Sequence, residues 1–206
     1  MPSADAIFLE IVEAAARSDT EVLRAAAYDL ETLLMYGDSA VATEIIERVI
    51  QLLQTPEFRG ANGVWHVLFA LRNDLDKVSE DDRRRLFVAM VDAYNSFADW
   101  MSCFVTSELT EYFPTPWALD IVRKRLTNLE EHARRHVPHA FEHIARAAKD
   151  RVIAREAFES LVSMLQDESP NVRDAARTSV ARIANTDSDL ASLAKQIIGI
   201  ESPDAR

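Results

Sequence analysis

Apolar residues recur at helical spacing along almost the whole chain, and this feature constrains the fold most. The first stripe comprises Ile7, Ile11, Ala14 and Ala15, a spacing that places one side of a helix against a core. No segment shows a convincing strand pattern. Only 4 Gly and 7 Pro occur among 206 residues, so a loop-rich or all-β chain is disfavoured. The sequence therefore predicts an all-α protein.

Breaks between the stripes divide the chain into helices. Asp19 or Thr20 is expected to cap the second helix, Gly37 to end it, and the prolines of "YFPTPW" (112–117) to interrupt the chain. "SEDD" at 79–82 is typical of a helix start. Besides the helix near 4–17, we expect a helix from Asp38 to about Leu53, a loop at "TPEFRGANG", and helices near 63–77, from 80 to as far as Trp100, and near 116–136, 138–149, 151–166, 170–184 and 187–199.

Two segments far apart in the chain share a pattern. "DTEVLRAAAYDLETL" at 19–33 aligns with "SPNVRDAARTSVARI" at 169–183. The aligned pairs are Val22 with Val172, Ala25 and Ala26 with Ala175 and Ala176, Leu30 with Val180, and Leu33 with Ile183. The arginines are one place out of step, Arg24 against Arg173. Paired alanines allow a neighbouring helix to approach closely, and branched residues fill the groove beside them.

The segment "QDESPNVRDAARTSVARIA" (166–184) resembles the second helix of a HEAT repeat, with "REAFESLVSMLQD" before it as the first helix. The resemblance is clear over 151–184, moderate over 4–35 and weak between them. It implies a HEAT-like right-handed α-solenoid of about five antiparallel helix pairs plus a terminal helix. We expect one domain over 1–200 and a frayed tail over 201–206. The alternative is an irregular helical bundle that contains this segment by chance.

Charge and targeting signals narrow the class of protein. The net charge is −11, but residues 119–155 carry 5 acidic and 9 basic side chains. The N-terminus lacks a basic region typical of a signal peptide, and "GVWHVLFAL" is too short to span a membrane. The single cysteine, Cys103, lies among apolar neighbours and is expected to be buried. We therefore expect a cytoplasmic protein, of a bacterial type.

Four of the five histidines lie within "HARRHVPHAFEH", at His132, His136, His139 and His143. Imidazoles four residues apart can share a metal ion. A helical wheel, however, places Val137, Phe141 and Ile144 on the core side and the histidines opposite. The sequence therefore predicts a solvated histidine face, with metal binding as the lesser alternative and no cofactor.

Enzymatic chemistry has little support in the sequence, which lacks a glycine-rich phosphate loop and the HExxH, GxSxG and CxxC motifs. The "PWALD" and "RKR" segments bear a faint similarity to HEAT-like DNA glycosylases. That similarity would give a nucleic-acid patch of Trp117, Asp120, Arg123, Lys124, Arg125, Arg134 and Arg135 within the basic segment 117–155. The net charge of −11 argues against this alternative, and Trp117 is otherwise expected to anchor the core.

The remaining hypothesis is protein binding, because the HEAT-like resemblance implies that second helices line a concave, protein-binding surface. The side chains expected on that surface are Arg24, Tyr28 and Glu31 in one helix and Asp174, Arg177 and Thr178 in another. We expect a non-enzymatic interaction module whose acidic surface binds a basic protein. An inhibitor or immunity protein for a basic toxin, such as a nuclease, would fit, and so would an adaptor.

Overall fold

The computed structural model describes residues 2–73, 75–125, 129–186 and 189–199. Every regular element in these ranges is a helix, so the predicted all-α fold is confirmed. No helix in the same ranges is long and apolar enough to cross a membrane. The tail predicted over 201–206 lies outside the described residues.

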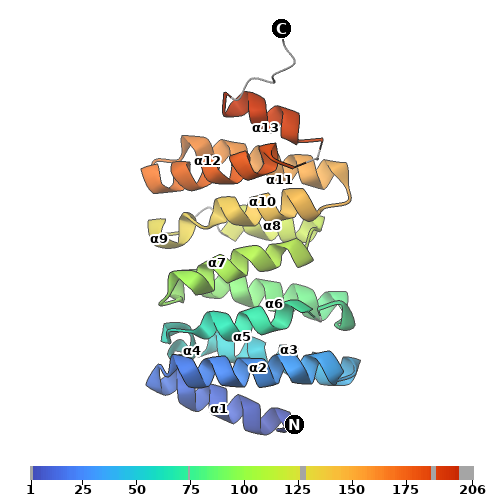
Figure 1. Cartoon of the computed structure of the whole chain (residues 1–206), viewed down its shortest axis with the longest axis vertical. Coiled ribbons are helices and arrows are strands. Elements are labelled where there is room, and N and C mark those ends of the chain that lie inside the picture. Colours follow the sequence, from blue (N-terminus) through green and yellow to red (C-terminus); the bar gives the residue numbers. More distant parts are fainter. Residues whose placement is uncertain (1, 74, 126–128, 187–188, 200–206) are drawn as a thin grey trace. The chain divides into compact units, whose positions relative to one another are not determined.

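Two compact units make up the chain, unit 1 over Met1–Tyr112 and unit 2 over Phe113–Arg206. Each is built from stacked antiparallel helices, as the sequence predicts for a solenoid-type fold (Figure 1). The single domain expected over 1–200 stays a prediction.

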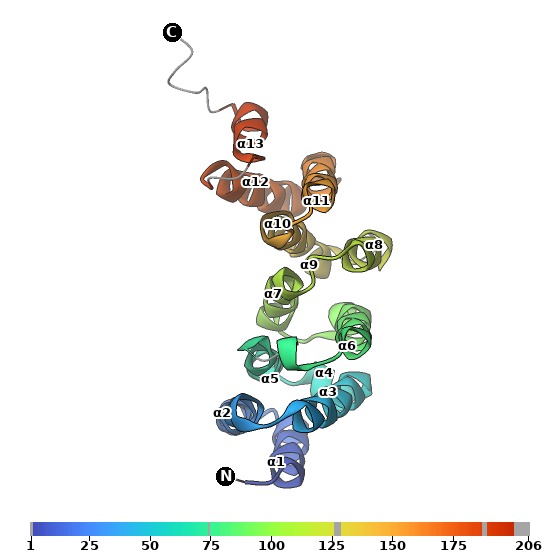
Figure 2. The same ribbon diagram turned by 90° about the vertical axis from the view of Figure 1, so that its right-hand side faces the viewer.

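Unit 1 arranges its helices in two layers. α2 (Thr20–Tyr36), α5 (Val64–Ala70) and α7 (Trp100–Leu109) pack in sequence in one layer, and α3 (Ser39–Gln54) and α6 (Glu80–Ala93) form the second (Figure 2). α1 (Ala4–Arg17) packs against α2, and the short α4 (Pro56–Gly60) packs against α1 and α3. Short 3-10 turns follow α5, α6 and α7, at Leu71–Asn73, Leu75–Lys77, Tyr94–Ser96 and Thr110–Tyr112.

Local capping explains where several of these helices begin. The side chain of Asp19 accepts a hydrogen bond from the Val22 amide, and that of Ser79 accepts one from the Asp82 amide. Both capping predictions are confirmed, with Asp19 rather than Thr20 as the cap of α2. Ile11 of α1, Leu23 and Leu30 of α2, and Val49 of α3 are among the fully buried residues of this unit.

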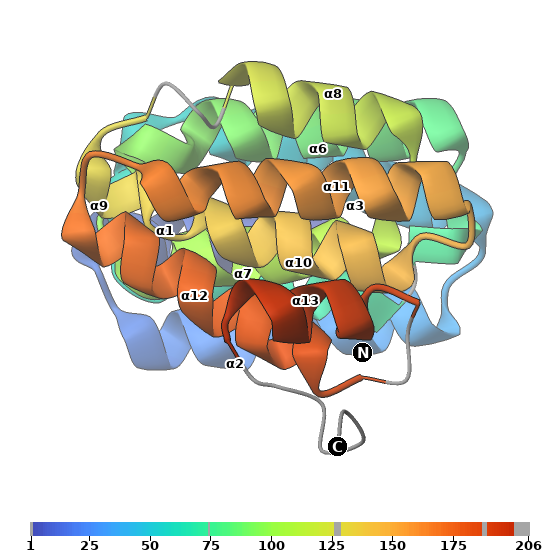
Figure 3. The same cartoon turned by 90° about the horizontal axis from the view of Figure 1, so that it is seen from above.

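Unit 2 follows the same plan. α10 (Val137–Ala147), α12 (Pro170–Ala184) and α13 (Ala191–Ile197) pack in sequence, and α8 (Pro116–Arg125) and α11 (Arg151–Ser163) lie alongside them. Figure 3 looks onto the α13 end and shows α11 beside α10 and α12. The short α9 (Glu131–Arg134) packs against α12, and a 3-10 turn at Met164–Gln166 joins α11 to α12.

Three predicted boundaries in the middle of the chain are wrong. The helix expected to reach Trp100 ends at Ala93, and α7 begins at Trp100 because Asp99 caps it through the Ser102 amide, 2.6 Å away. The expected 63–77 helix tightens into 3-10 turns after Ala70. The expected 116–136 helix is two helices, α8 and α9.

Part of the predicted "TPEFRGANG" loop is also helical. Pro56 stands at the start of α4, where its missing amide hydrogen costs nothing. By contrast, the predicted bounds 4–17 and 170–184 agree with α1 and α12. Cys103 is buried, as predicted.

The buried stripe of α2 is rotated from the predicted one. Its core residues are Leu23, Ala26, Ala27, Leu30 and Leu34. Val22 and Leu33 are half-buried, and Ala25 is exposed. α1 and α5 both pack against α2, and their positions set the buried direction, which the apolar spacing alone does not fix.

Candidate partner-binding face

The side of α2 opposite its core carries the first group of predicted contact residues. Tyr28 is 70% exposed. Arg24 is exposed and donates to Glu21 Oε2 at 2.6 Å, and Glu31 is half-buried. Because Arg24 is already paired with Glu21, the tyrosine ring is the largest apolar group that this side of α2 offers to a partner.

α5 carries further aromatic side chains, which were not among the predicted contact residues. The rings of Trp65 and His66 are stacked with their centroids 3.6 Å apart, and both residues are half-buried. One turn further on, the Arg72 guanidinium carbon lies 3.7 Å from the centre of the Phe69 ring. Trp65, His66 and Phe69 therefore lie on the side of α5 opposite its buried residues.

His66 lies among charged groups of both neighbouring helices. Burial lowers its pKa, the charge of Arg24 lowers it further, and the charges of Glu21 and Asp99 oppose the change. These interactions reach α2 on one side and the start of α7 on the other. α5 therefore lies between α2 and α7, and it packs against both.

Asp99 joins the starts of α5 and α7. Its carboxylate accepts from the Gly63 amide at 2.9 Å and from the Ser102 amide at 2.6 Å. This double contact holds the beginning of α7, where Trp100 is 56% exposed and packs edge-on to Phe104 with centroids 6.1 Å apart. Trp100 and Phe104 are four residues apart and so share one side of the helix.

We define the aromatic face as Tyr28, Trp65, His66, Trp100 and Phe104. Only Tyr28 was predicted from the sequence. For Trp100 and Phe104 the sequence offers one signal, the aspartate cap Asp99, which lies within the helix predicted to reach Trp100. Glu21, Glu31 and Asp99 border the face, and unit 1 as a whole has 20 Asp and Glu against 9 Lys and Arg.

The second predicted group, on α12, is exposed but mostly satisfied by its own helix. Arg177 donates to Asp174 Oδ1 at 2.8 Å, and the Thr178 hydroxyl donates to the Asp174 carbonyl at 2.9 Å. None of these three side chains brings an aromatic surface. α2 and α12 therefore present different chemistry on their exposed sides.

The predicted nucleic-acid patch is divided between α8 and α9, and acidic partners occupy several of its cations. Arg123 pairs with Glu156 at 3.0 Å, and Lys124 pairs with Asp120 at 2.8 Å. Arg134 contacts Asp167 at 3.0 Å and Glu168 at 2.9 Å. Arg125 and Arg135 are exposed. Trp117 is half-buried, with its ring 5.9 Å from that of Phe113, so it is only partly an anchor of the core.

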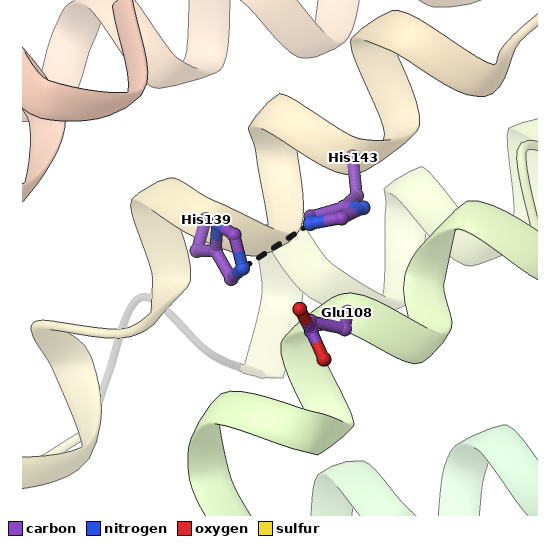
Figure 4. Close-up of side chains that lie close together, drawn as sticks. All are labelled: Glu108, His139 and His143. Carbon is purple, nitrogen blue, oxygen red and sulfur yellow. Dashed lines mark hydrogen bonds between the residues drawn. The ribbon is translucent and has the colours of Figure 1, made fainter. Parts of the chain in front are cut away.

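The prediction that the histidine stripe faces solvent is wrong for α10. His139 is buried, and His136 and His143 are half-buried, whereas His132 is exposed. A helical wheel allows only one buried side, but α10 packs against three helices, α8, α11 and α12. His139 and His143 lie one turn apart, with their Nε2 atoms 3.1 Å from each other (Figure 4). Glu108, which Figure 4 also draws, belongs to unit 1.

The four histidines do not form one metal-binding group. His132 lies 3.6 Å from Glu130, and His136 accepts a hydrogen bond from Arg135 at 3.2 Å. Among the described residues of unit 2, no three of these histidines bring ligand atoms within 4.8 Å of one another. Burial, followed by the charges of Arg135, His139 and His132, lowers the pKa of His136 to about 4.

A buried carboxylate organises the same helix. Glu142 has no exposed surface, and it accepts from Arg146 at 3.1 Å and from Arg182 of α12 at 3.3 Å. His139 Nδ1 lies 3.2 Å from Glu142 and 3.0 Å from Arg182. Burial alone would raise the pKa of Glu142, but the hydrogen bond from His139 and the charges of His139 and Arg182 outweigh it and lower that pKa. This cluster ties α10 to α12.

No family model and no curated protein sequence matches the chain. Several solved structures of designed armadillo repeat proteins are similar to it. One, designed for modular peptide recognition, is 17% identical and has a TM-score of 0.38, with 92% of this chain and 87% of that chain covered. A second is 16% identical with a TM-score of 0.39, covering 95% and 92% of the two chains. A third, in complex with the peptide (KR)4, is 19% identical with a TM-score of 0.34, covering 92% and 85%. At TM-scores this low the backbones diverge, so the ligands of those designs give no information about this chain.

Proposed function

We propose that the protein is a HEAT-like, non-enzymatic module that binds a basic protein through the aromatic face of unit 1. One observation carries the proposal: Tyr28 and Trp100 are 70% and 56% exposed on the same helix layer, α2–α5–α7. Exposed apolar side chains that gather on one face of a protein are typical of interaction sites. Tyr and Trp are also the residues that most often dominate binding energy at protein interfaces.

The charge of unit 1 determines the kind of partner. Its 20 acidic and 9 basic side chains account for the whole net charge of −11. Glu21, Glu31 and Asp99 stand at the edges of the aromatic face. Such a surface speeds association with a cationic protein and repels an acidic one. A basic partner could also place arginine side chains on the exposed rings.

An inhibitor or immunity protein for a basic toxin would use such a surface, as would an adaptor subunit, and the cytoplasm is the proposed site of action. The support for a role in binding rather than chemistry is that the charged groups of the face serve the fold. Arg24 is paired with Glu21, and Asp99 caps α7 and holds Gly63. Binding of nucleic acid through 117–155 is the weaker candidate, because Arg123, Lys124 and Arg134 are already neutralised by carboxylates.

Affinity capture from the native host lysate tests the proposal. The tagged full chain is immobilised, and proteins that co-purify at low and at moderate salt are identified by mass spectrometry. We expect one stoichiometric basic protein, which is released as salt rises because ions screen exposed charges beyond roughly 10 Å at 0.1 M ionic strength. Recovery of nucleic acid, or a partner whose retention is independent of ionic strength, would contradict the proposal.

Paired variants locate the interface. Tyr28→Ala and Trp100→Ala should each reduce the captured amount at least tenfold. Tyr36→Ala is the control for loss of an exposed tyrosine, because Tyr36 is also on α2 and is 73% exposed, but it lies two turns further along the helix, at its end. Equal loss with the control variant would show that the aromatic face is not the interface.

A further inference from the structure

A groove on the other layer of unit 1 has the features of a second binding site. It lies over α3, α4 and α6 and encloses a volume of about 640 Å³, within the range of ligand-binding pockets. Its floor is apolar, formed by side chains such as Ile50, Leu53 and Val88. Its rim is charged and exposed to solvent, so the groove is open along the surface.

Three arginines line this groove, and two of them make no ion pair with a carboxylate of the described residues. Arg85 is held by Glu47 at 2.9 Å and by Asp82 at 3.4 Å. The Nε atom of Arg59 is buried and has no hydrogen-bond partner among the described residues, and the same is true of Arg83, which lies outside the groove. The exposed guanidinium of Arg84 makes no hydrogen bond or ion pair with any residue that the structure describes. The guanidinium groups of Arg59 and Arg84 are therefore cations of the groove that no described carboxylate neutralises.

The remaining charges of the groove restrict the ligand. A guanidinium presents its donors in a planar fork that matches a carboxylate. Asp81 and Asp92 also line the groove, and together with the acidity of unit 1 they oppose a phosphate group or a polyanion. A ligand with a single carboxylate next to an apolar group satisfies both the arginines and the floor. Because the groove is open, a peptide segment fits it better than a small molecule that needs enclosure.

We propose that this groove binds a peptide segment with one acidic side chain beside an apolar one, its carboxylate held by Arg59 and Arg84. The apolar neighbour rests on the floor formed by α3 and α6. The site is separate from the aromatic face, which lies on α2, α5 and α7. The experiment on the groove can therefore contradict this proposal without contradicting the proposed function of the aromatic face, and the reverse is also true.

Nuclear magnetic resonance on the full ¹⁵N-labelled chain tests the groove directly, by following the arginine Nε–Hε signals. The probe is a capped tripeptide with glutamate between two leucines, and its counterpart carries glutamine in place of glutamate. We expect the glutamate peptide to shift the Arg59 and Arg84 signals in a saturable way and the glutamine peptide to leave them unmoved. Arg84→Gln should weaken the affinity about tenfold, as loss of a hydrogen bond to a charged group does.

Arg83→Gln is the matched control, because Arg83 is the preceding residue of α6 but does not line the groove, and its affinity should equal that of the wild type. Arg84 is exposed, so its replacement leaves the fold intact. Equal shifts with both peptides, or no shift at Arg59 and Arg84 up to the solubility limit of the glutamate peptide, would overturn the proposal. So would inorganic phosphate that moves these signals further than the glutamate peptide does at equal concentration.

Discussion

Units 1 and 2 are built from similar stacks of helices, but they differ in net charge and in which polar and aromatic side chains they bury. Unit 1 carries the entire net charge and exposes Tyr28 and Trp100, whereas unit 2 has 14 acidic and 14 basic side chains and buries Glu142 completely. In unit 2 the buried carboxylate of Glu142 and the guanidinium of Arg182 join α10 to α12, whereas the ion pair Arg24–Glu21 of unit 1 is exposed. The apolar stripes determine the stacked helices, which are alike in both units, whereas the polar and aromatic side chains between the stripes make the units different.

The related helices α2 and α12 show the same division on a smaller scale. Their caps align as the sequence predicts, since Asp19 bonds the Val22 amide and Ser169 bonds the Val172 amide. Their buried residues align best with a shift of one position, so that Leu23 of α2, rather than Val22, corresponds to Val172 of α12. In that second alignment Arg24 stands opposite Arg173, so the apparent slip of the arginine is removed. The alignment of the two helices by their capping residues therefore differs by one position from the alignment by their buried residues.

Removal of the buried carboxylate should have the largest effect on stability. Glu142→Ala should lower the free energy of unfolding by about 3 kcal/mol, because Arg146, Arg182 and His139 lose their common acceptor. Urea denaturation measures the change. Glu21→Ala is the control in unit 1, where an exposed ion pair should contribute less than about 1 kcal/mol. Similar losses for both variants would remove the contrast between the units.

Larger residues at the two buried alanines should have the next largest effect. Ala26→Leu in α2 and Ala176→Leu in α12 each force a side chain into a packed contact and should cost about 1–3 kcal/mol. Ala25→Leu should be nearly neutral, because Ala25 is exposed in the observed register of α2. If Ala25→Leu were as costly as Ala26→Leu in urea denaturation, the register described for α2 would be wrong.

Unit 2 should also lose stability in acid. The pKa of His136 is lowered to about 4 from 6.5, so the unfolded chain binds this proton more readily, and stability falls as pH drops from 6.5 towards 4. The lowered pKa of Glu142 adds stability above 4.5 that is lost as the pH falls through its folded value. The titration of His136, followed by nuclear magnetic resonance, should have a midpoint near 4. A midpoint near 6.5 would show an exposed imidazole.

The smallest expected effect on stability comes from the exposed aromatic residues of unit 1. Tyr28→Ala should change the free energy of unfolding by no more than about 0.5 kcal/mol, because the ring is mostly in water. Urea denaturation alongside Glu142→Ala gives the comparison directly. A loss above about 2 kcal/mol would mean that Tyr28 supports the fold rather than a partner.

The sequence predicts those parts of the fold that short-range signals determine. α1 and α12 have clear caps and apolar stripes, so their bounds could be predicted from the sequence. The start of α7 could not, because its cap, Asp99, lies within an apolar stripe that continues from α6 to Met101. The histidine prediction failed because a helical wheel does not say how many neighbours cover a helix. The groove could not be predicted, because Arg59 and Arg84 come from separate helices that only the tertiary structure brings together.

The central claim is that binding energy resides in the aromatic face of unit 1 and not on the exposed side of α12. The most direct measurement is the affinity of the captured partner, by isothermal titration calorimetry, for Trp100→Ala and for Arg177→Ala. We predict that Trp100→Ala weakens binding by about 2 kcal/mol or more, as loss of a central aromatic contact does, and that Arg177→Ala leaves it unchanged. Unchanged affinity for Trp100→Ala, with a loss for Arg177→Ala, would contradict the claim.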